Sequence, residues 1–374
     1  MLRPESRDLR RLATKLLRAG RDQLGQGEAL LSGPVFAGTY RLVGDPTGAP
    51  YTYGRYSNPT WSAYEATLTE LEGGPAVVFA SGMAAIAAVL CSVLRPGDIV
   101  VLPADGYYTV RQFAEGYLTA MGVQVRRVPS GPAQQDVLEG ARLLWLESPT
   151  NPGLDVCDLR GLAQAARTAG ALVAVDNTTA TVLAQQPLAL GADFSVSSDT
   201  KAMTGHSDLL LGHVAVRDPE LLPSLLTWRT QVGAIAGPME TWLAHRSLAT
   251  LDVRLRRQCA TALTIATALA GHPAIVACRY PGLPLDPAHA LATAQMSMYG
   301  PIVSFTLTDQ AAADALLDAL RVVTPATSFG GVHSTAERRA RWGGDEVHPG
   351  FVRLSIGLED PADLLEDLTR TMNH

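Results

Sequence analysis

One lysine in an arginine-rich chain carries the clearest chemical signal. The 30 basic residues include only two lysines, Lys15 and Lys201. Lys201 lies in the segment SVSSDTKAMTGHSDLLLG, after a short apolar run and among small hydroxyl residues. A lysine that forms an imine must be partly desolvated, so that its amine is neutral often enough to react. Most lysines are exposed surface residues, but a lysine retained where the chain otherwise uses arginine indicates chemistry that arginine cannot perform.

A second candidate, Asp176, directly follows the apolar run ALVAV and precedes Lys201 by 25 residues. A carboxylate at the end of a buried strand is costly unless it meets a positive partner. A protonated pyridine nitrogen would be such a partner, and its protonation would make the ring an electron sink. A helix N-cap is an equally good interpretation, because aspartate favours that position.

Two groups of small residues could bind a phosphate. Ser81, Gly82 and Met83 open a helical segment after an apolar run. Free backbone N–H groups and the helix dipole make such a position suitable for an anion. Ser198 and Thr200 stand beside the lysine and could add hydroxyl groups. A plain tight turn between strand and helix is the alternative for the first group.

Other candidates could stack on a ring or bind a carboxylate. Tyr107 or Tyr108 could stack on a planar cofactor, although a buried core tyrosine is as good an interpretation. Asn151, in ESPTNP, could reach a polar group of a ligand, but a turn residue before proline is the stronger interpretation from the residues alone. Arg353, in FVRLSIGLED, requires an anionic partner within its apolar strand. That partner is a substrate carboxylate, with Ser328 assisting, or a structural salt bridge.

The elements that must position these residues alternate between short strands and helices up to about residue 235. This pattern predicts an α/β unit with a mainly parallel, seven-stranded sheet covered on both faces. Ligands of such sheets bind at the carboxyl ends of the strands, which is where several candidates fall. The expected strands are 76–79, 99–102, 123–128, 143–146, 171–175, 194–196 and 213–216.

The pattern changes after residue 235 and predicts a smaller α+β unit with an antiparallel sheet. We expect an N-terminal arm over 1–50, a large domain over 51–235 and a C-terminal domain over 236–374. The expected elements of the last domain are a helical region over 238–269, strands at 302–307 and 352–356, and helices at 311–320 and from Pro361.

Composition excludes several classes of protein. The net charge of −6 and the isoelectric point near 5.8 argue against nucleic-acid binding, which requires a basic surface. The chain has no uninterrupted stretch of about 18 apolar residues, so we expect no membrane span. The four cysteines and eight histidines form no metal-binding spacing, so we expect no metal. The cysteines lie in or beside apolar stretches, which indicates reduced thiols and a cytoplasmic location. The basic N-terminus predicts a surface helix or a tail and lacks the features of a secretory signal.

Taken together, these motifs resemble the Cys/Met-metabolism family of enzymes that use pyridoxal 5′-phosphate (PLP). Its members include cystathionine γ-lyase, cystathionine γ-synthase, cystathionine β-lyase and methionine γ-lyase, and the likeness is greatest to actinobacterial cystathionine γ-lyases. The matching segments run from YTYGRYSNPT at Tyr51 to RLSIGLED at Arg353, in the family order. The resemblance implies the type I fold of PLP-dependent transferases and PLP as the cofactor.

The family pattern also implies a role for each matching residue. Members are usually homotetramers built from dimers with shared active sites, and they act on small amino acids. Lys201 would form the imine and transfer protons, Tyr107 would stack on the ring and take part in catalysis, and Asp176 would pair with the pyridine nitrogen. The cofactor phosphate would be bound by Ser81, Gly82, Met83, Ser198 and Thr200, and that of a neighbouring subunit by Tyr53 and Arg55. The substrate would be bound by Asn151, Thr327, Ser328 and Arg353.

Three departures from the family pattern bear on specificity. The segment from Gly106 to Thr109 is one residue shorter than usual, and we assign the stacking role to Tyr107 because stacking requires a ring. Thr327 stands where many cystathionine enzymes have a glutamate that can meet the distal amino group. Threonine is shorter and uncharged, which puts that substrate in doubt. His333 also replaces a common glutamate, and nothing in the sequence explains this change.

The expected reaction is γ-elimination from cystathionine or a related sulfur amino acid. It would release a thiol, 2-oxobutanoate and ammonia. The alternatives are γ-replacement by a cystathionine γ-synthase or a homoserine-ester sulfhydrylase, methionine γ-lyase activity and β-lyase activity. A PLP-binding protein without catalysis is a remote alternative, and the joint presence of Lys201, Asp176 and Arg353 argues against it.

Overall fold

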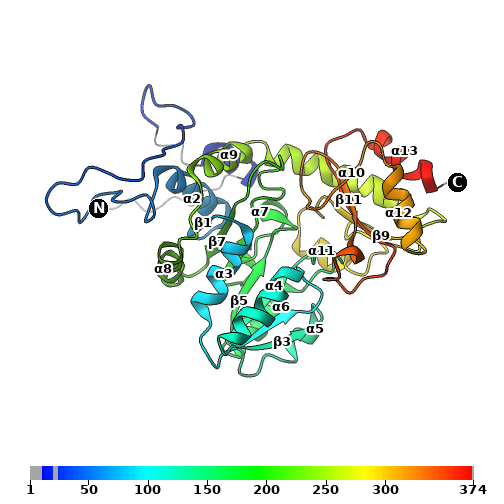
Figure 1. Ribbon diagram of the computed structural model, residues 1–374, viewed down its shortest axis with the longest axis horizontal. Helices are drawn as coiled ribbons and strands as arrows, with labels where there is room; N and C mark the ends of the chain where they lie inside the picture. The colour runs from blue at the N-terminus through cyan, green and yellow to red at the C-terminus, as the bar shows by residue number, and fades with distance from the viewer. Residues whose placement is uncertain (1–10, 20–23, 373–374) are drawn as a thin grey trace.

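The computed structural model describes residues 11–19 and 24–372. Two units, each built around a β-sheet, lie side by side, and an extended segment leaves the first of them (Figure 1). This segment precedes α2 (Pro59–Glu72) and consists mainly of loops. Within the basic N-terminal region, residues 12–18 form the short helix α1 (Leu12–Arg18), whereas residues 1–10 lie outside the described part.

The first unit contains a seven-stranded sheet with the strand order β1-β7-β6-β5-β4-β2-β3. β7 pairs antiparallel with both of its neighbours, and all other adjacent pairs are parallel. The mainly parallel sheet expected from the sequence is therefore confirmed. Its strands are β1 (Ala76–Phe79), β2 (Ile99–Pro103), β3 (Gln124–Val128), β4 (Leu143–Glu147), β5 (Leu172–Asp176), β6 (Phe194–Ser197) and β7 (Gly212–Val216).

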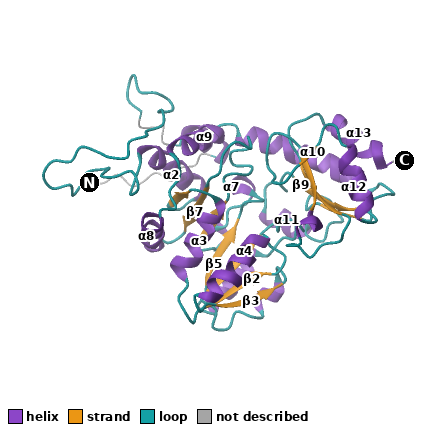
Figure 2. Ribbon diagram, viewed as in Figure 1, coloured by secondary structure: helices purple, strands orange, loops and turns teal. Residues whose placement is uncertain are grey.

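Helices cover both faces of this sheet (Figure 2). Side chains alternate between the faces along a strand, so Trp145 packs on the side of α3 (Gly82–Val93), whereas Leu144 and Leu146 pack on the side of α6 (Leu159–Thr168). Burial of both faces explains why the strands are almost wholly apolar. The remaining helical segments of this unit are α4 (Tyr108–Phe113), the π-helix η1 (Ala114–Leu118), α5 (Pro132–Gln135), α7 (Thr181–Ala184), η2 (Leu188–Leu190), η3 (Pro219–Leu221) and α8 (Leu222–Val232).

The second unit contains a five-stranded sheet with the order β10-β11-β12-β9-β8. Its pairs are antiparallel, as expected, except for the short parallel pair of β10 and β11. One apolar core joins this sheet to α10, α12 and α13. Its elements are α9 (Pro238–Leu248), α10 (Leu251–Ala270), β8 (Ala277–Arg279), α11 (His289–Gln295), β9 (Ile302–Thr306), α12 (Gln310–Ala319), β10 (Thr324–Pro325), β11 (Thr335–Arg338), η4 (Arg339–Trp342), β12 (Phe351–Ser355) and α13 (Pro361–Met372).

The helical region expected over 238–269 is two helices, with a break at Ala249 and Thr250. The last carbonyls of a helix have no partner within it and need donors from elsewhere. The guanidinium of Arg254 supplies one, because it donates to the carbonyl of Ser247 at the end of α9, as well as to Ala202 and to Met203 near the lysine. The break thus ties the helix pair to the lysine-bearing loop.

Three further observations concern the described residues alone. None of their helices is long and apolar enough to cross a membrane. No group of three or more His, Cys, Asp or Glu side chains among them could hold a metal ion. The four cysteines are free thiols, of which Cys91 and Cys157 are buried and Cys259 and Cys278 are half-buried.

Candidate active site

A cavity of about 410 Å³ lies at the carboxyl ends of the large sheet, and residues of the second unit complete its wall. All but two of the fourteen residues predicted for the site line it: Ser81, Gly82, Met83, Tyr107, Asn151, Asp176, Ser198, Thr200, Lys201, Thr327, Ser328 and Arg353. Sequence reasoning assigned no role to several other lining residues: Ile86, Glu147, Thr178, Thr179, Leu210, Phe329, Arg339 and Trp342.

Lys201 lies in the loop after β6 and reaches toward the second unit. Its Nζ donates to Ser328 Oγ at 2.7 Å and lies 5.2 Å from the centre of the Phe329 ring. Burial, followed by the positive charge of Arg353, lowers the pKa of Lys201 to about 8. The amine is therefore neutral far more often than that of an exposed lysine, as imine formation requires.

Two carboxyl groups end neighbouring parallel strands beside this lysine. Glu147 at the end of β4 and Asp176 at the end of β5 are paired in register, and both are buried. Burial raises the pKa of both groups, and the charge of Asp176 raises the pKa of Glu147 further. Asp176 Oδ1 accepts from the backbone N–H of Thr178, but α7 begins only at Thr181, so Asp176 is not its N-cap. Two adjacent buried carboxyls favour a positive group in the cavity.

The N-terminus of α3 forms a narrow cradle next to the lysine loop. Ser81 caps the helix and accepts from the N–H of Ala84 at 3.1 Å. A Cβ at Gly82 would lie 2.5 Å from the Cβ of Ser198, so only glycine allows the helix and the loop to approach so closely. The Thr200 hydroxyl lines the cavity but donates to Leu211 O and accepts from Leu211 N. Helix N–H groups and serine hydroxyls suit a phosphate here.

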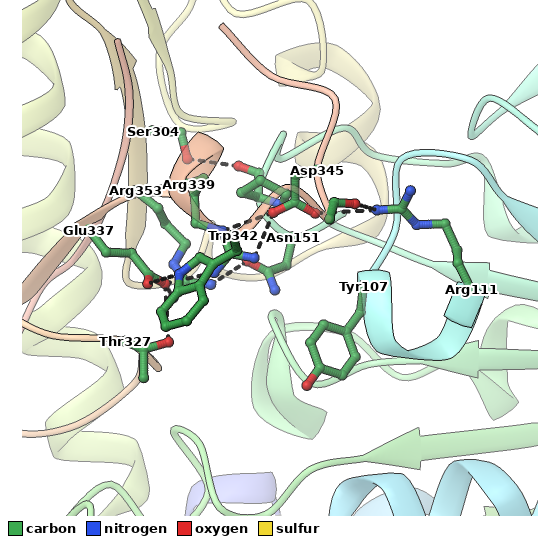
Figure 3. Close-up of polar contacts among 12 residues, drawn as sticks. Tyr107, Arg111, Asn151, Ser304, Thr327, Glu337, Arg339, Trp342, Asp345 and Arg353 are labelled. Atoms are coloured by element: carbon green, nitrogen blue, oxygen red, sulfur yellow. Dashed lines mark hydrogen bonds and ion pairs between the residues drawn. The ribbon is translucent and has the colours of Figure 1, made fainter. Parts of the chain in front are cut away.

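Tyr107 and Tyr108 both line the cavity but have different surroundings. The backbone N–H of Tyr107 donates to Glu147 Oε2 at 2.6 Å. Figure 3 shows its ring extending away from α4, and the residue lines the cavity. The Tyr108 ring instead packs beside Gly344, where a Cβ would lie 2.8 Å from its ring atoms. This difference supports Tyr107 as the ring available for stacking.

Arg353 of β12 is buried, and its guanidinium is held from several directions. Nη1 donates to Asn151 Oδ1 at 2.7 Å, and Nη2 donates to the carbonyl of Ser328 at 2.9 Å and to Glu337. Burial, followed by the charge of Arg339, lowers the pKa of Arg353 to about 10. The structural salt bridge considered from the sequence is thus present. Nε–H and the second Nη1–H remain as donors for a carboxylate.

Glu337 connects this arginine to a network that the sequence did not indicate (Figure 3). Its carboxylate accepts from Arg353, from Arg339 at 2.7 Å, from Trp342 Nε1 at 2.9 Å and from the Thr327 hydroxyl at 3.4 Å. Burial opposes its charge, but chiefly Arg353 holds the pKa of Glu337 below its usual value. Thr327 therefore contributes no charge to the cavity wall, and its hydroxyl is already hydrogen-bonded to Glu337.

The network continues across the boundary between the two units. Arg339 also donates to Asp345, and Arg111 of α4 donates to Asp345 and to the carbonyl of Gly344. Three arginines thus share two carboxylates, those of Glu337 and Asp345, and the cluster has an excess of one positive charge. A carboxylate bound at this end of the cavity would neutralise that excess.

Tyr53 and Arg55 are not brought to the cavity of their own chain. The Arg55 guanidinium donates to the carbonyl of Thr230 at 2.9 Å and lies over the rings of Tyr53 and Tyr56, at 5.5 and 5.1 Å from their centres. The Tyr53 side chain is exposed. Both residues belong to the extended segment before α2.

Comparison with known proteins identifies the class. The family described as "Cys/Met metabolism PLP-dependent enzyme" matches residues 13–373. The chain belongs to this family, so it is an enzyme that uses PLP, with the fold that its type I members share.

Individual relatives narrow the likeness to carbon–sulfur chemistry. A Streptomyces coelicolor protein provisionally named a cystathionine γ-lyase is 58% identical over 366 residues, which cover 96% of this chain and 93% of that protein. The Mycobacterium tuberculosis cystathionine γ-synthase is 39% identical over 86% of each chain. The solved structure of a methionine γ-lyase from Micromonospora echinospora is 39% identical, with a TM-score of 0.90 and coverage of 97% of this chain and 99% of that one.

Proposed function

We propose that this enzyme catalyses γ-elimination on cystathionine or a related sulfur amino acid. The products are a thiol, 2-oxobutanoate and ammonia. The observation that carries the proposal is one cavity that joins a buried lysine of lowered pKa, a strand-end carboxyl and an arginine cluster with excess positive charge. The first two features suit PLP, and the third suits the carboxylate of an amino acid.

The residues of the cavity fit PLP on three independent observations. The cradle at Gly82 and Ser198 is too narrow for a Cβ and suits a phosphate, and the amine of Lys201 suits imine formation. Asp176, buried beside a second carboxyl, suits a protonated ring nitrogen. PLP, when bound, supplies an electron sink that stabilises negative charge at Cα.

The chain's own residues then bind the substrate and move its protons. Arg353 and Asn151 hold the α-carboxylate and so orient the Cα–H bond. Nζ of Lys201, free once the substrate is attached, accepts the Cα proton as general base. Ser328 Oγ lies 2.7 Å from Nζ and keeps this amine in place. The γ-thiolate departs as a second proton leaves Cβ, and it takes up one proton to become the thiol. Water supplies the ketone oxygen when the remaining product is released as 2-oxobutanoate and ammonia.

Methionine γ-lyase activity is the alternative that a specific observation favours. The cavity is also lined by the large apolar side chains of Phe329, Leu210 and Trp342, and the Thr327 hydroxyl is paired with Glu337. An apolar thioether would be accepted there without burying an unpaired charge. γ-Replacement and β-elimination share the early proton transfers, and the cofactor residues do not separate them.

A panel of purified substrates tests the proposal. Cystathionine, methionine, cysteine, homocysteine and acylated homoserines are each incubated with the PLP-loaded enzyme, and ketoacid and thiol are measured with and without an added thiol acceptor. We expect 2-oxobutanoate from cystathionine without an acceptor, and none from the Lys201→Ala variant. If product forms only when a thiol acceptor is added, the reaction is γ-replacement. If no substrate is turned over although PLP is bound, the protein binds the cofactor without catalysis.

We further propose that Tyr53 and Arg55 complete the cavity of a second copy in a cytoplasmic homotetramer. In support, the extended segment that carries them exposes Leu30, Phe36 and Val43. This proposal treats 1–50 as an arm, 51–235 as the cofactor domain and 236–374 as the C-terminal domain. Mixing Arg55→Ala chains with Lys201→Ala chains under subunit exchange should restore activity that neither has alone. Lack of recovery in mixed oligomers verified by mass spectrometry would contradict shared sites.

A further inference from the structure

Glu147 has no role in the mechanism above, yet both of its carboxylate oxygens are committed within the cavity. Oε2 accepts from the backbone N–H of Tyr107 at 2.6 Å, and Oε1 accepts from the backbone N–H of Asn151 at 2.7 Å. The side chain is buried and lines the cavity. Burial, followed by the charge of Asp176, raises the pKa of this carboxyl, and the two N–H donors act in the opposite direction.

The chain is built locally to allow this contact. A Cβ at Gly106 would lie 2.8 Å from Glu147 Oε2 and 2.8 Å from Cγ of Pro103. Only glycine therefore lets the backbone before Tyr107 approach the carboxylate. The shortened segment that begins at Gly106 thus places the N–H of Tyr107 on Glu147.

The two residues that Glu147 holds lead to different parts of the site. Tyr107 provides a ring at the cavity, whereas the Asn151 side chain accepts from Nη1 of Arg353. Figure 3 shows Asn151 beside Arg353, with the Tyr107 ring below them in the view. One carboxylate therefore fixes the backbone both at the aromatic ring and at the arginine fork.

Glu147 is also one of the two strand partners of Asp176. The two residues are paired in register at the ends of β4 and β5. Asp105, from the loop after β2, also raises the pKa of Glu147, whereas the charge of Lys201 favours the ionised form of Asp176. Like charges so close disfavour ionisation of both carboxyls at once, so Glu147 acts here through its two hydrogen bonds rather than through its charge.

We propose that Glu147 is a positioning residue, which fixes Tyr107 and Asn151 through their backbone N–H groups. The inference rests on the proposed function for its substrate. It does not require turnover, because the bound cofactor itself reports the geometry of the site.

The test compares Glu147→Gln, Glu147→Asp and Glu65→Gln in the PLP-loaded enzyme. Gln keeps one oxygen acceptor and replaces the other with an amide NH2 group, whereas Asp keeps both acceptors but is too short to reach both N–H groups. Glu65 is the matched control: it accepts from the N–H of Val78 and pairs with Arg229 but does not line the cavity. The measurements are visible circular dichroism of bound PLP, and KM and kcat for the best substrate.

Glu147→Gln should change the visible circular dichroism and raise KM about tenfold, because a hydrogen bond to the backbone at Tyr107 or Asn151 is lost. Glu147→Asp should change the dichroism and KM in the same way. Glu65→Gln should change neither. Wild-type dichroism and KM in a folded Glu147→Gln would overturn the proposal. If the cofactor signals change as expected but no substrate is turned over, the proposed function is refuted and the positioning role of Glu147 stands.

Discussion

The lowered pKa of Lys201 predicts how the apoenzyme captures PLP. Only the neutral amine attacks the aldehyde. At pH 7 an amine with a pKa of about 8 is neutral about 10% of the time, against about 0.03% for the ordinary lysine value of 10.5. The structure therefore predicts capture at neutral pH roughly 300-fold faster than an exposed lysine of equal reactivity would allow.

The assay is stopped-flow mixing of apoenzyme with PLP across the pH range, with the visible absorption of lysine-bound cofactor as the signal. The rate constant should rise about tenfold per pH unit at low pH and level off above about pH 8. Lys15→Ala, which removes the only other lysine of the chain, should leave the curve unchanged.

Two variants of one ion pair make this prediction stringent. Arg353 lowers the pKa of Lys201 and Glu337 raises it. Arg353→Met should therefore move the midpoint of the rate curve to higher pH, and Glu337→Gln should move it to lower pH. A wild-type midpoint near 10.5, or shifts of the two variants in the same direction, would refute the reasoning.

Two further substitutions test the cofactor cradle and a buried ion cluster. Gly82→Ala should weaken PLP binding about tenfold or more in a fluorescence titration, because the new Cβ would lie 2.5 Å from the Cβ of Ser198 and would push that residue away. Unchanged affinity would contradict a phosphate site between Gly82 and Ser198. His213 is buried between Asp199, at 2.6 Å, and Glu72, at 3.1 Å, so His213→Gln should lower the free energy of unfolding in urea by about 3–5 kcal/mol. Burial opposes the charge of His213, but the two carboxylates raise its pKa from 6.5 to about 10, so its contribution is full below pH 6.5 and is lost as the pH rises toward 10. If the difference in unfolding free energy between the wild type and His213→Gln stays constant from pH 6.5 to 10, a charged His213 is contradicted.

Several residues that follow short apolar runs were expected at one edge of the sheet, and the structure brings them to one cavity. Lys201, Asp176 and the Ser81–Met83 turn each follow a short apolar run, and a parallel sheet brings such positions to one edge whatever the loops between them do. The break between α9 and α10 escaped prediction, because it depends on a contact between Arg254 and the distant lysine loop.

Glu147 and Glu337 show why the rest of the site required the structure. Glu147 was visible in ESPTNP, but its partners Tyr107 and Asp176 reach it only through the pairing of strands and the turn at Gly106. Glu337 is close to Arg353 because β11 and β12 are antiparallel neighbours that place the two residues in register.

For Tyr53 and Arg55, the family pattern implied contact with the cofactor phosphate of a neighbouring subunit, which stays a prediction. In a single chain the Arg55 side chain contacts Tyr56 and Thr230 rather than the cavity. The sequence by itself determined the chemistry available, namely a lysine for imine formation, a strand-end carboxyl and an arginine for a carboxylate, since each depends on residue type and on its place after a strand. Only the tertiary structure decided which charges are paired, which backbone N–H groups are held and how far the Lys201 pKa falls, because burial and distance between remote segments set those quantities.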